Sequence, residues 1–231
     1  KRREEGIHDA DILDRLLGAK DPDTGRSMDE TQLRDEVVTL MLAGHETSAN
    51  ALAWTLHLLG EHPEIEQRLY EEIGVAVGDT PASAVDLNNM PYLKQVVQES
   101  MRIYPPVWAI ARRSEEPAEY NGFYIPEKSY IGVVPYALHR DPKFWPDPTK
   151  FDPDRFSPEN AKGRNSYCYL PFAAGPRACI GASMAMLEIQ LVLAQIVRRY
   201  RLKMVPGHPI ESVAKVTLRP RHGVAMTIEP R

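Results

Sequence analysis

The chain has 231 residues, of which 43% are hydrophobic and 26% are charged. This is the composition of a soluble globular protein, because a disordered chain has less apolar surface to bury and a membrane-embedded protein has far more. The formal net charge of −4, from 28 basic and 32 acidic residues, argues against nucleic acid as the main partner. The length fits a single domain over residues 1–231, or at most two.

The two cysteines, Cys168 and Cys179, are too few for a disulfide framework. No Cys-x2-Cys pair or His-Glu-x-x-His sequence indicates a zinc site. We therefore expect a reducing, cytoplasmic location. Residues 1–6 lack the apolar core of a signal peptide, and no run of about 18 apolar residues occurs, so we expect no membrane span in this chain.

A long helix is predicted to follow residue 27. Ser27 and Glu30 have the spacing of a capping box, and the next helix-breaking residue is Pro63. The apolar residues of this segment fall on too many faces for a surface helix, which predicts burial nearly all round. They are Leu33, Val37, Val38, Leu40, Met41, Leu42, Leu52, Trp54, Leu56 and Leu59.

Three more helices are indicated by apolar residues at helical spacing, with proline or glycine near their ends. They are expected over residues 63–78, 91–104 and 180–200. The chain between residues 105 and 176 holds twelve of the 20 prolines, which favours loops and short strands. We expect strands at 107–112, 123–125 and 130–134, and a terminal hairpin with strands near 215–218 and 224–228.

The most informative segment is residues 171–181, in which a loop rich in proline and glycine leads Cys179 to the start of the last helix. Unpaired amides and the positive dipole end of that helix favour a negatively charged sulfur. The residues Phe172, Gly175, Arg177, Cys179 and Gly181 have a spacing that resembles the heme-ligand signature of the cytochrome P450 family. Outside such a pattern, a free cysteine is most often a small packing residue, and Cys168 keeps that interpretation.

Three further motifs occur in the order that the family shows. Residues 43–48 resemble its oxygen-binding segment, Glu99 and Arg102 resemble its Glu-x-x-Arg motif, and residues 153–156 resemble its Pro-Glu-Arg-Phe element with Asp in place of Glu. The resemblance implies that Glu99, Arg102 and Arg155 form a buried triad that holds the cysteine loop. From spacing alone, Glu99 and Arg102 would be a solvated pair on a helix.

The long helix is expected to carry the chemistry. Thr47 lies four residues after Ala43, so its hydroxyl can bond the Ala43 carbonyl, bend the helix and open a groove beside Gly44. The resemblance implies that dioxygen binds in this groove and that Glu46 and Thr47 deliver protons to it. The alternative is a threonine that bonds its own helix without a function, beside a solvated Glu46.

The resemblance also implies the cofactor heme b (iron protoporphyrin IX). Cys179 would be the iron ligand, Arg177 and Arg112 would bind the propionates, and Phe172 would pack near the sulfur. Gly181, Ala43 and Gly44 are the remaining predicted heme contacts. Because strand residues alternate, only one of Arg112 and Arg113 can face the heme, and we prefer Arg112. The alternative for these arginines is a solvated strand edge.

The predicted substrate contacts share an apolar character, which favours a hydrophobic small molecule, although any protein core would show the same. They are Leu42, Ala43, Val107, Ala109 and Val216.

The resemblance covers nearly the whole chain but only the C-terminal half of the family's fold, a mainly α fold with small β-sheets, a long central helix and a cysteine-ligand loop. The first hypothesis is a P450 monooxygenase that takes electrons from a separate redox partner, namely a ferredoxin, a flavodoxin or a flavoprotein reductase. A further expected partner is the N-terminal half of the fold, which the resemblance does not include. The second is a heme-binding remnant or interaction module without turnover, and the third is a helical domain without a cofactor.

Overall fold

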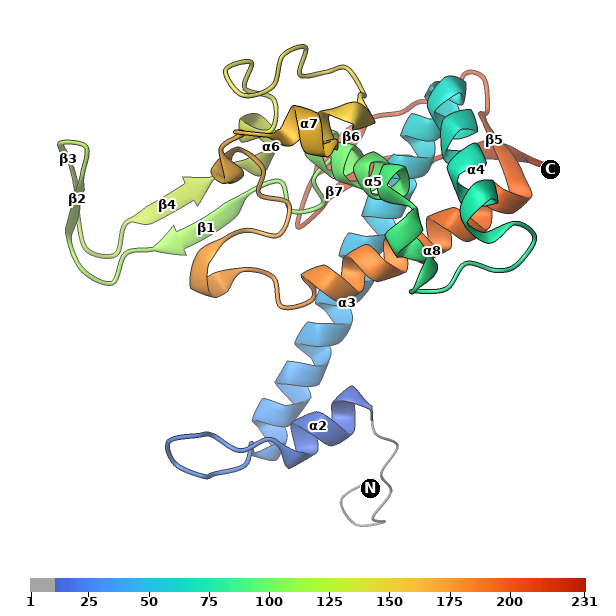
Figure 1. The fold of residues 1–231 in the computed structure, drawn as a ribbon. Coiled ribbons are helices and arrows are strands. Elements are labelled where there is room, and N and C mark those ends of the chain that lie inside the picture. The colour runs from blue at the N-terminus through green and yellow to red at the C-terminus, as the bar shows by residue number, and fades with distance from the viewer. Residues whose placement is uncertain (1–10) are drawn as a thin grey trace. The chain divides into compact units, whose positions relative to one another are not determined.

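The computed structural model describes residues 11–231, which form a mainly helical chain with four small antiparallel sheets, as the sequence predicts (Figure 1). The longer helices are α2 (Ile12–Gly18), α3 (Glu30–Glu61), α4 (Pro63–Val77), α5 (Pro91–Ile103) and α8 (Ala182–Arg199). The shorter helical turns are η1 (Asp86–Asn89), α6 (Pro135–Leu138), η2 (Pro153–Phe156), α7 (Pro158–Ala161), η3 (Ser166–Cys168) and η4 (Gly175–Arg177).

Two compact units make up the chain, one ending at Glu46 and the other spanning Thr47–Arg231. The expectation of a single domain over residues 1–231 stays a prediction. No helix within residues 11–231 combines the length and the apolar character needed to cross a lipid bilayer.

Helix α3 begins two residues later than the predicted capping box would place it. The Asp29 carboxylate accepts the backbone N–H of Gln32 at 2.8 Å, so Asp29 caps the helix, and the capping role predicted for Ser27 is wrong. Ser27 instead lies in a β-bridge with Lys20. Both residues are good caps, and the bridge fixes Ser27 in an extended backbone before the helix can start.

The burial of α3 agrees with the prediction only after Thr47. Ala51, Trp54 and Leu59 are buried there, whereas Met41 and Leu42 are 74% and 68% exposed. The prediction of burial nearly all round is therefore wrong for the first half of the helix. An apolar pattern shows that a segment is suited to burial, but it does not show which polypeptide covers it.

The core of the larger unit lies where α4, α5, α8 and the end of α3 pack together. The predicted helix boundaries are confirmed here, because Pro63 and Pro91 start α4 and α5 and Gly78 follows α4 with a φ of +54°. The largest fully buried apolar side chains of this core are Leu59, Leu69, Ile73, Met90, Leu93, Ile189 and Leu193.

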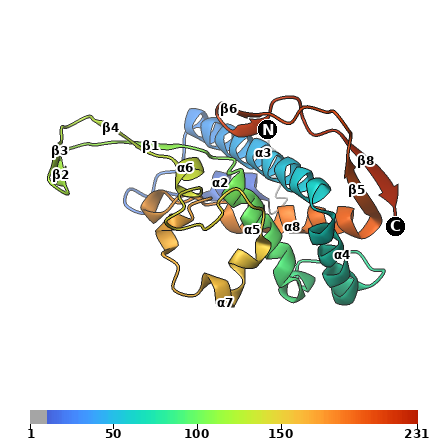
Figure 2. The ribbon, with the colours of Figure 1, turned by 90° about the horizontal axis from the view of Figure 1, so that it is seen from above.

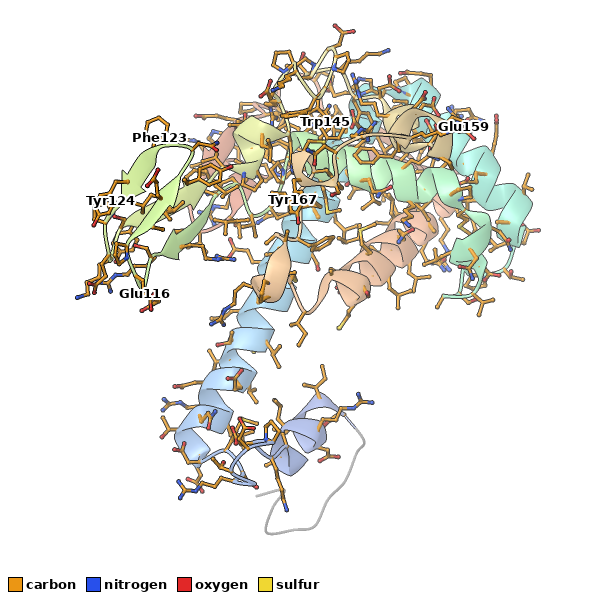
Figure 3. All side chains as sticks on the ribbon, turned by 60° about the vertical axis from the view of Figure 1, so that its left-hand side comes forward. Glu116, Phe123, Tyr124, Trp145, Glu159 and Tyr167 are labelled. Carbon is orange, nitrogen blue, oxygen red and sulfur yellow. The ribbon has the colours of Figure 1, made fainter. Side chains whose placement is uncertain are left out.

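Strands β1 (Ile110–Arg113) and β4 (Tyr130–Val133) pair, and between them β2 (Ala118–Tyr120) and β3 (Phe123–Ile125) form a second hairpin. The strands expected at 123–125 and 130–134 are confirmed, whereas the one expected at 107–112 starts only at Ile110. The two hairpins extend away from α5 and α8 (Figure 2), and Phe123 and Tyr124 lie at the far end (Figure 3).

The predicted terminal hairpin is wrong. Strand β7 (Leu218–Pro220) pairs with β6 (Ser212–Ala214), and β8 (Met226–Pro230) pairs with β5 (Tyr200–Met204). The Lys215 amide donates to the Thr217 carbonyl at 3.1 Å and closes the turn between β6 and β7. Strand β5 continues directly from α8 and supplies β8 with a partner from a distant part of the sequence.

Candidate functional site

The cysteine loop, residues 171–181, folds back on itself before α8. The Cys179 N–H donates to the Phe172 carbonyl at 2.9 Å, which joins the exit of the loop to its entry. Between them the chain turns through Ala173 and Gly175, whose φ angles are +60° and +74°. A left-handed conformation at a residue with a Cβ costs about 1 to 2 kcal/mol, and strain of this kind is typical of functional loops.

The Cys179 thiol is free and exposed. It lies three residues before Ala182, the first residue of α8, and Gly181 forms the helix N-cap. A Cβ on Gly181 would lie 3.9 Å from the cysteine sulfur, which is an ordinary van der Waals distance, so Gly181 lies next to the thiol. The loop therefore presents one sulfur outward at the positive end of an 18-residue helix.

The residues predicted to hold the cofactor have the chemistry that a heme requires. A cysteine sulfur is a suitable ligand for heme iron, and the apolar side chains of Ile180, which is 94% exposed, and Met184 offer surface to a flat apolar ring. Arg177 and Arg112 are exposed cations of the kind that propionates require. Phe172, predicted to pack near the sulfur, is half-buried against the core.

Glu99 and Arg102 form a fully buried ion pair on α5. The Arg102 Nε and Nη2 atoms donate to the two oxygens of Glu99 at 2.6 and 2.8 Å, and neither side chain is exposed. Burial raises the pKa of Glu99, and the hydrogen bonds from Arg102 oppose that rise. The alternative of a solvated surface pair is therefore not what the structure shows.

The remaining donors of Arg102 bind backbone carbonyls on a segment distant in sequence. Nη1 donates to the carbonyls of His139 and Pro148, both at 2.8 Å, and Nη2 donates to that of Lys150 at 3.2 Å. One buried guanidinium thus connects α5 with the proline-rich segment, whose turns cannot supply all of their own hydrogen bonds.

Arg155 reaches the same ion pair from the short helix η2. Its Nε lies 3.4 Å from the nearer Glu99 oxygen, and its Nη2 donates to the Asp147 carbonyl at 2.9 Å. The structure thus brings the three predicted triad residues together. Asp154, which stands where the family motif has Glu, pairs with Arg68 of α4 at 2.8 and 2.9 Å.

Two side-chain contacts that the sequence did not indicate fix the chain just before the cysteine loop. The Trp145 Nε1–H donates to the Cys168 carbonyl at 3.3 Å, and the Tyr169 hydroxyl donates to the Gln98 carbonyl of α5 at 2.8 Å. Cys168 is itself buried, and burial raises the pKa of its thiol. It is a packing residue, as the sequence predicts.

The predicted substrate residues Val107 and Val216 lie on segments that are hydrogen-bonded to each other. The Leu218 N–H donates to the Pro106 carbonyl at 2.9 Å, and the Trp108 Nε1–H donates to the Lys215 carbonyl at 2.8 Å. Val216 is 88% exposed at the turn between β6 and β7.

Helix α3 meets the same turn through Asn50, whose Nδ2 donates to the Thr217 hydroxyl at 3.0 Å. Thr47 is half-buried one turn earlier in an uninterrupted α-helix, and the predicted bend stays a prediction. Leu42, Ala43, Gly44 and Glu46 belong to the other compact unit. Their predicted contacts with cofactor, oxygen and substrate also stay predictions.

Comparison with known proteins gives a consistent result. The family model for cytochrome P450 matches residues 1–228. Human cytochrome P450 4V2 is 38% identical over 223 residues, which cover 95% of this chain and 42% of that protein. Cyclooctatin synthase of Streptomyces melanosporofaciens is 39% identical over 220 residues, which cover 95% of this chain and 46% of that one.

Among solved structures, the retinoic acid-bound cyanobacterial CYP120A1 matches all of this chain with a TM-score of 0.94 and 32% identity. The match covers 53% of that protein. The chain thus spans about half the length of the relatives that it matches.

Proposed function

Because the chain belongs to the cytochrome P450 family, we propose that it is the thiolate-bearing half of a heme monooxygenase in which Cys179 binds the iron. The observation that carries this proposal is the exposed thiol of Cys179. The hydrogen bond from the Cys179 N–H to the Phe172 carbonyl holds it just before the N-terminus of α8. Heme b would be held by Cys179 and Phe172, with Arg177 and Arg112 on its propionates.

When bound, the heme would supply the activation of dioxygen, with one oxygen atom entering a C–H bond and the other leaving as water at the expense of two electrons and two protons. The chain's own contribution to that reaction is the proton supply. The carboxyl group of Glu46 would take a proton from solvent, and the Thr47 Oγ1 would hold it at the oxygen-binding groove. The electrons would come from a separate redox partner.

The substrate would be a hydrophobic small molecule. Val107, Ala109 and Val216 would form one wall of its site, because the hydrogen bonds between segments 106–108 and 215–218 hold these residues together. One similar structure contains retinoic acid, which is largely apolar and in keeping with such a wall.

The spectrum of the ferrous carbon monoxide complex tests this proposal, because a thiolate ligand shifts the Soret band to the red. We expect heme-loaded chain to show the shifted band, Cys179→Ala to lose it entirely, and Cys168→Ala to keep it as the matched control. A shifted band in Cys179→Ala, or its loss in Cys168→Ala alone, would show that Cys179 is not the ligand.

The second candidate is a heme-binding chain without turnover, and the observation that favours it is the exposure of the Cys179 thiol, which would leave the iron site open to water. A site open to water would lose protons and reactive oxygen to solvent. Oxygen consumption with a redox partner and an apolar substrate separates the two. Coupled product formation supports the monooxygenase, and heme binding without product supports the second candidate.

A further inference from the structure

His139 lies fully buried directly after the short helix α6, and it contacts two distant parts of the larger unit. Its carbonyl oxygen accepts the Nη1–H of Arg102 at 2.8 Å. Its ring nitrogen Nε2 accepts the backbone N–H of Leu170, also at 2.8 Å. One residue therefore joins the buried ion pair of α5 to the segment that enters the cysteine loop.

The contact with Leu170 fixes the chemical form of the ring. A backbone N–H only donates, so Nε2 carries no proton and the neutral ring has its proton on Nδ1. Burial lowers the pKa of His139 to about 4, and the neighbouring charges of Arg102 and Arg140 act in the same direction. The backbone of Arg102 and Met101 opposes the shift, although Nδ1 makes no hydrogen bond of ordinary geometry within residues 11–231. The ring is thus a neutral acceptor at neutral pH.

Leu170, which His139 holds by its amide, lies immediately before the loop that carries the Cys179 thiol. Its carbonyl accepts the Ala173 N–H at 3.3 Å, so the residue is held on both sides as the loop begins. Two residues later, the Phe172 carbonyl accepts the Cys179 N–H at 2.9 Å. The contacts of Tyr169 and Cys168 fix the chain one and two residues before Leu170, so Leu170 is the closest of the three anchored residues to Cys179 along the chain.

We propose that His139 is a positioning residue for the thiolate ligand: its Nε2 fixes the Leu170 amide, and thereby the entry of the cysteine loop, against the buried Glu99–Arg102 pair. A neutral acceptor suits this place, because a protonated ring could not accept the Leu170 N–H and would put a further buried positive charge near Arg102 and Arg140. The importance of His139 for heme binding rests on the proposed function. Its restraint of the loop does not depend on that function.

Three variants separate acceptor chemistry from packing. His139→Leu removes the acceptor and keeps most of the volume. His139→Gln keeps an acceptor oxygen near the position of Nε2, whereas the side chain of His139→Asn is too short to reach it. His57→Leu is the matched control, because His57 is a second buried histidine, on α3, whose pKa burial also lowers.

Amide hydrogen exchange of the chain without cofactor is the first measurement. We expect the Leu170 and Cys179 amides to exchange about tenfold faster in His139→Leu and His139→Asn, with protection restored in His139→Gln and unchanged in His57→Leu. Equal protection in His139→Leu and the unchanged chain overturns the proposal, and so does failure of His139→Gln to restore it. Should His139→Leu not fold, the comparison of Gln with Asn decides.

The ferrous carbon monoxide spectrum of heme-loaded chain is the second measurement. We expect His139→Leu to show a smaller fraction of the red-shifted band than His139→Gln or His57→Leu at equal heme content. If no variant and no unchanged chain takes up heme, the proposed function fails while the exchange result still decides the role of His139. If exchange changes and the spectrum does not, the loop is restrained by His139 but the ligand is not positioned by it, which also overturns the proposal.

Discussion

Helix α5 and the cysteine loop differ in what they bury. Charged side chains are usually exposed and apolar ones buried, but these two regions show the reverse. Helix α5 buries a complete ion pair, Glu99 with Arg102, whereas the loop exposes its thiol and its neighbour Ile180. The loop therefore gains little rigidity from apolar burial of its own. Its order comes from backbone hydrogen bonds at its two ends and from the polar contacts of the segment before it.

Helix α5 and the cysteine loop therefore contribute differently to stability: the first to the whole larger unit, the second only locally. The buried pair is costly to desolvate and must satisfy every donor, and Arg102 does so by binding carbonyls of the proline-rich segment. A change in α5 should therefore weaken the whole larger unit. A change in the loop or its anchors should act locally.

The largest effect is expected for Arg102→Leu, which leaves Glu99 buried without its partner. Removing one member of a buried pair costs about 3 to 5 kcal/mol, measurable as a lower urea midpoint. Because only the smaller contributions of the Asp152 N–H and Arg155 then oppose burial, the pKa of Glu99 should rise further, and part of the lost stability should return as the pH is lowered.

The control for this variant is an ion pair on the surface. Lys203 and Glu229 lie 2.6 Å apart with both side chains about half exposed, so Lys203→Ala should cost at most about 1 kcal/mol. Similar losses of stability in the two variants would show that the buried pair contributes no more than the exposed one.

The next effect concerns pH and arises from His139. Because its pKa is lowered to about 4 from 6.5, the unfolded chain binds the proton more readily between these two values. Stability therefore rises with pH from about 4 to 6.5 and is lost as the pH falls through that window, by about 3 kcal/mol for this group. Urea unfolding across the window should show this slope.

His139→Gln serves as the control for the pH effect, because glutamine does not titrate. The slope attributable to residue 139 should disappear in this variant, while contributions from buried carboxyl groups such as Glu72, whose pKa burial raises, remain and act in the opposite direction. An identical pH profile in both proteins would contradict the assignment to His139.

Helix ends could be predicted from the sequence, whereas long-range contacts could not. Prolines and glycines gave the ends of α4 and α5 correctly, because their backbone effects are local. The partner of β8 is non-local, and no short pattern near that strand identified β5. The partner of β7 is the neighbouring strand β6, whose three residues form no recognisable strand pattern. The choice of Asp29 over Ser27 depended on a β-bridge that a capping pattern does not contain.

The candidate site shows the same limit. Spacing identified Cys179, Glu99, Arg102 and Arg155 as belonging to motifs, and the structure brings the last three together. His139 stands between Leu138 and Arg140 in a segment without periodicity, so nothing in the sequence showed that it is buried. A buried polar residue is recognised only when its partners are seen, since each of them lies far away in the chain.

A smaller, local effect is expected for Trp108→Phe, which removes the hydrogen bond to the Lys215 carbonyl. Without it, the turn that carries Val216 should open more often, by a factor of about five for a bond worth about 1 kcal/mol. Trypsin cleavage after Lys215 should be faster by that factor while the urea midpoint changes little. Trp145→Phe is the matched control and should leave cleavage at Lys215 unchanged.

The smallest effect is expected within the cysteine loop itself, at two adjacent alanines with different backbones. Ala173 has a φ of +60°, where glycine avoids the strain of a Cβ, whereas Ala174 is extended with a φ of −155°. Relief of about 1 kcal/mol of strain is partly offset by the greater entropy of glycine in the unfolded chain, so Ala173→Gly should be neutral or stabilising by about 0.5 kcal/mol. Ala174→Gly has no strain to relieve and should destabilise by about 0.5 to 1 kcal/mol. Opposite signs in urea unfolding would show that the loop holds its strained turn before any cofactor binds, and equal losses would show that it does not.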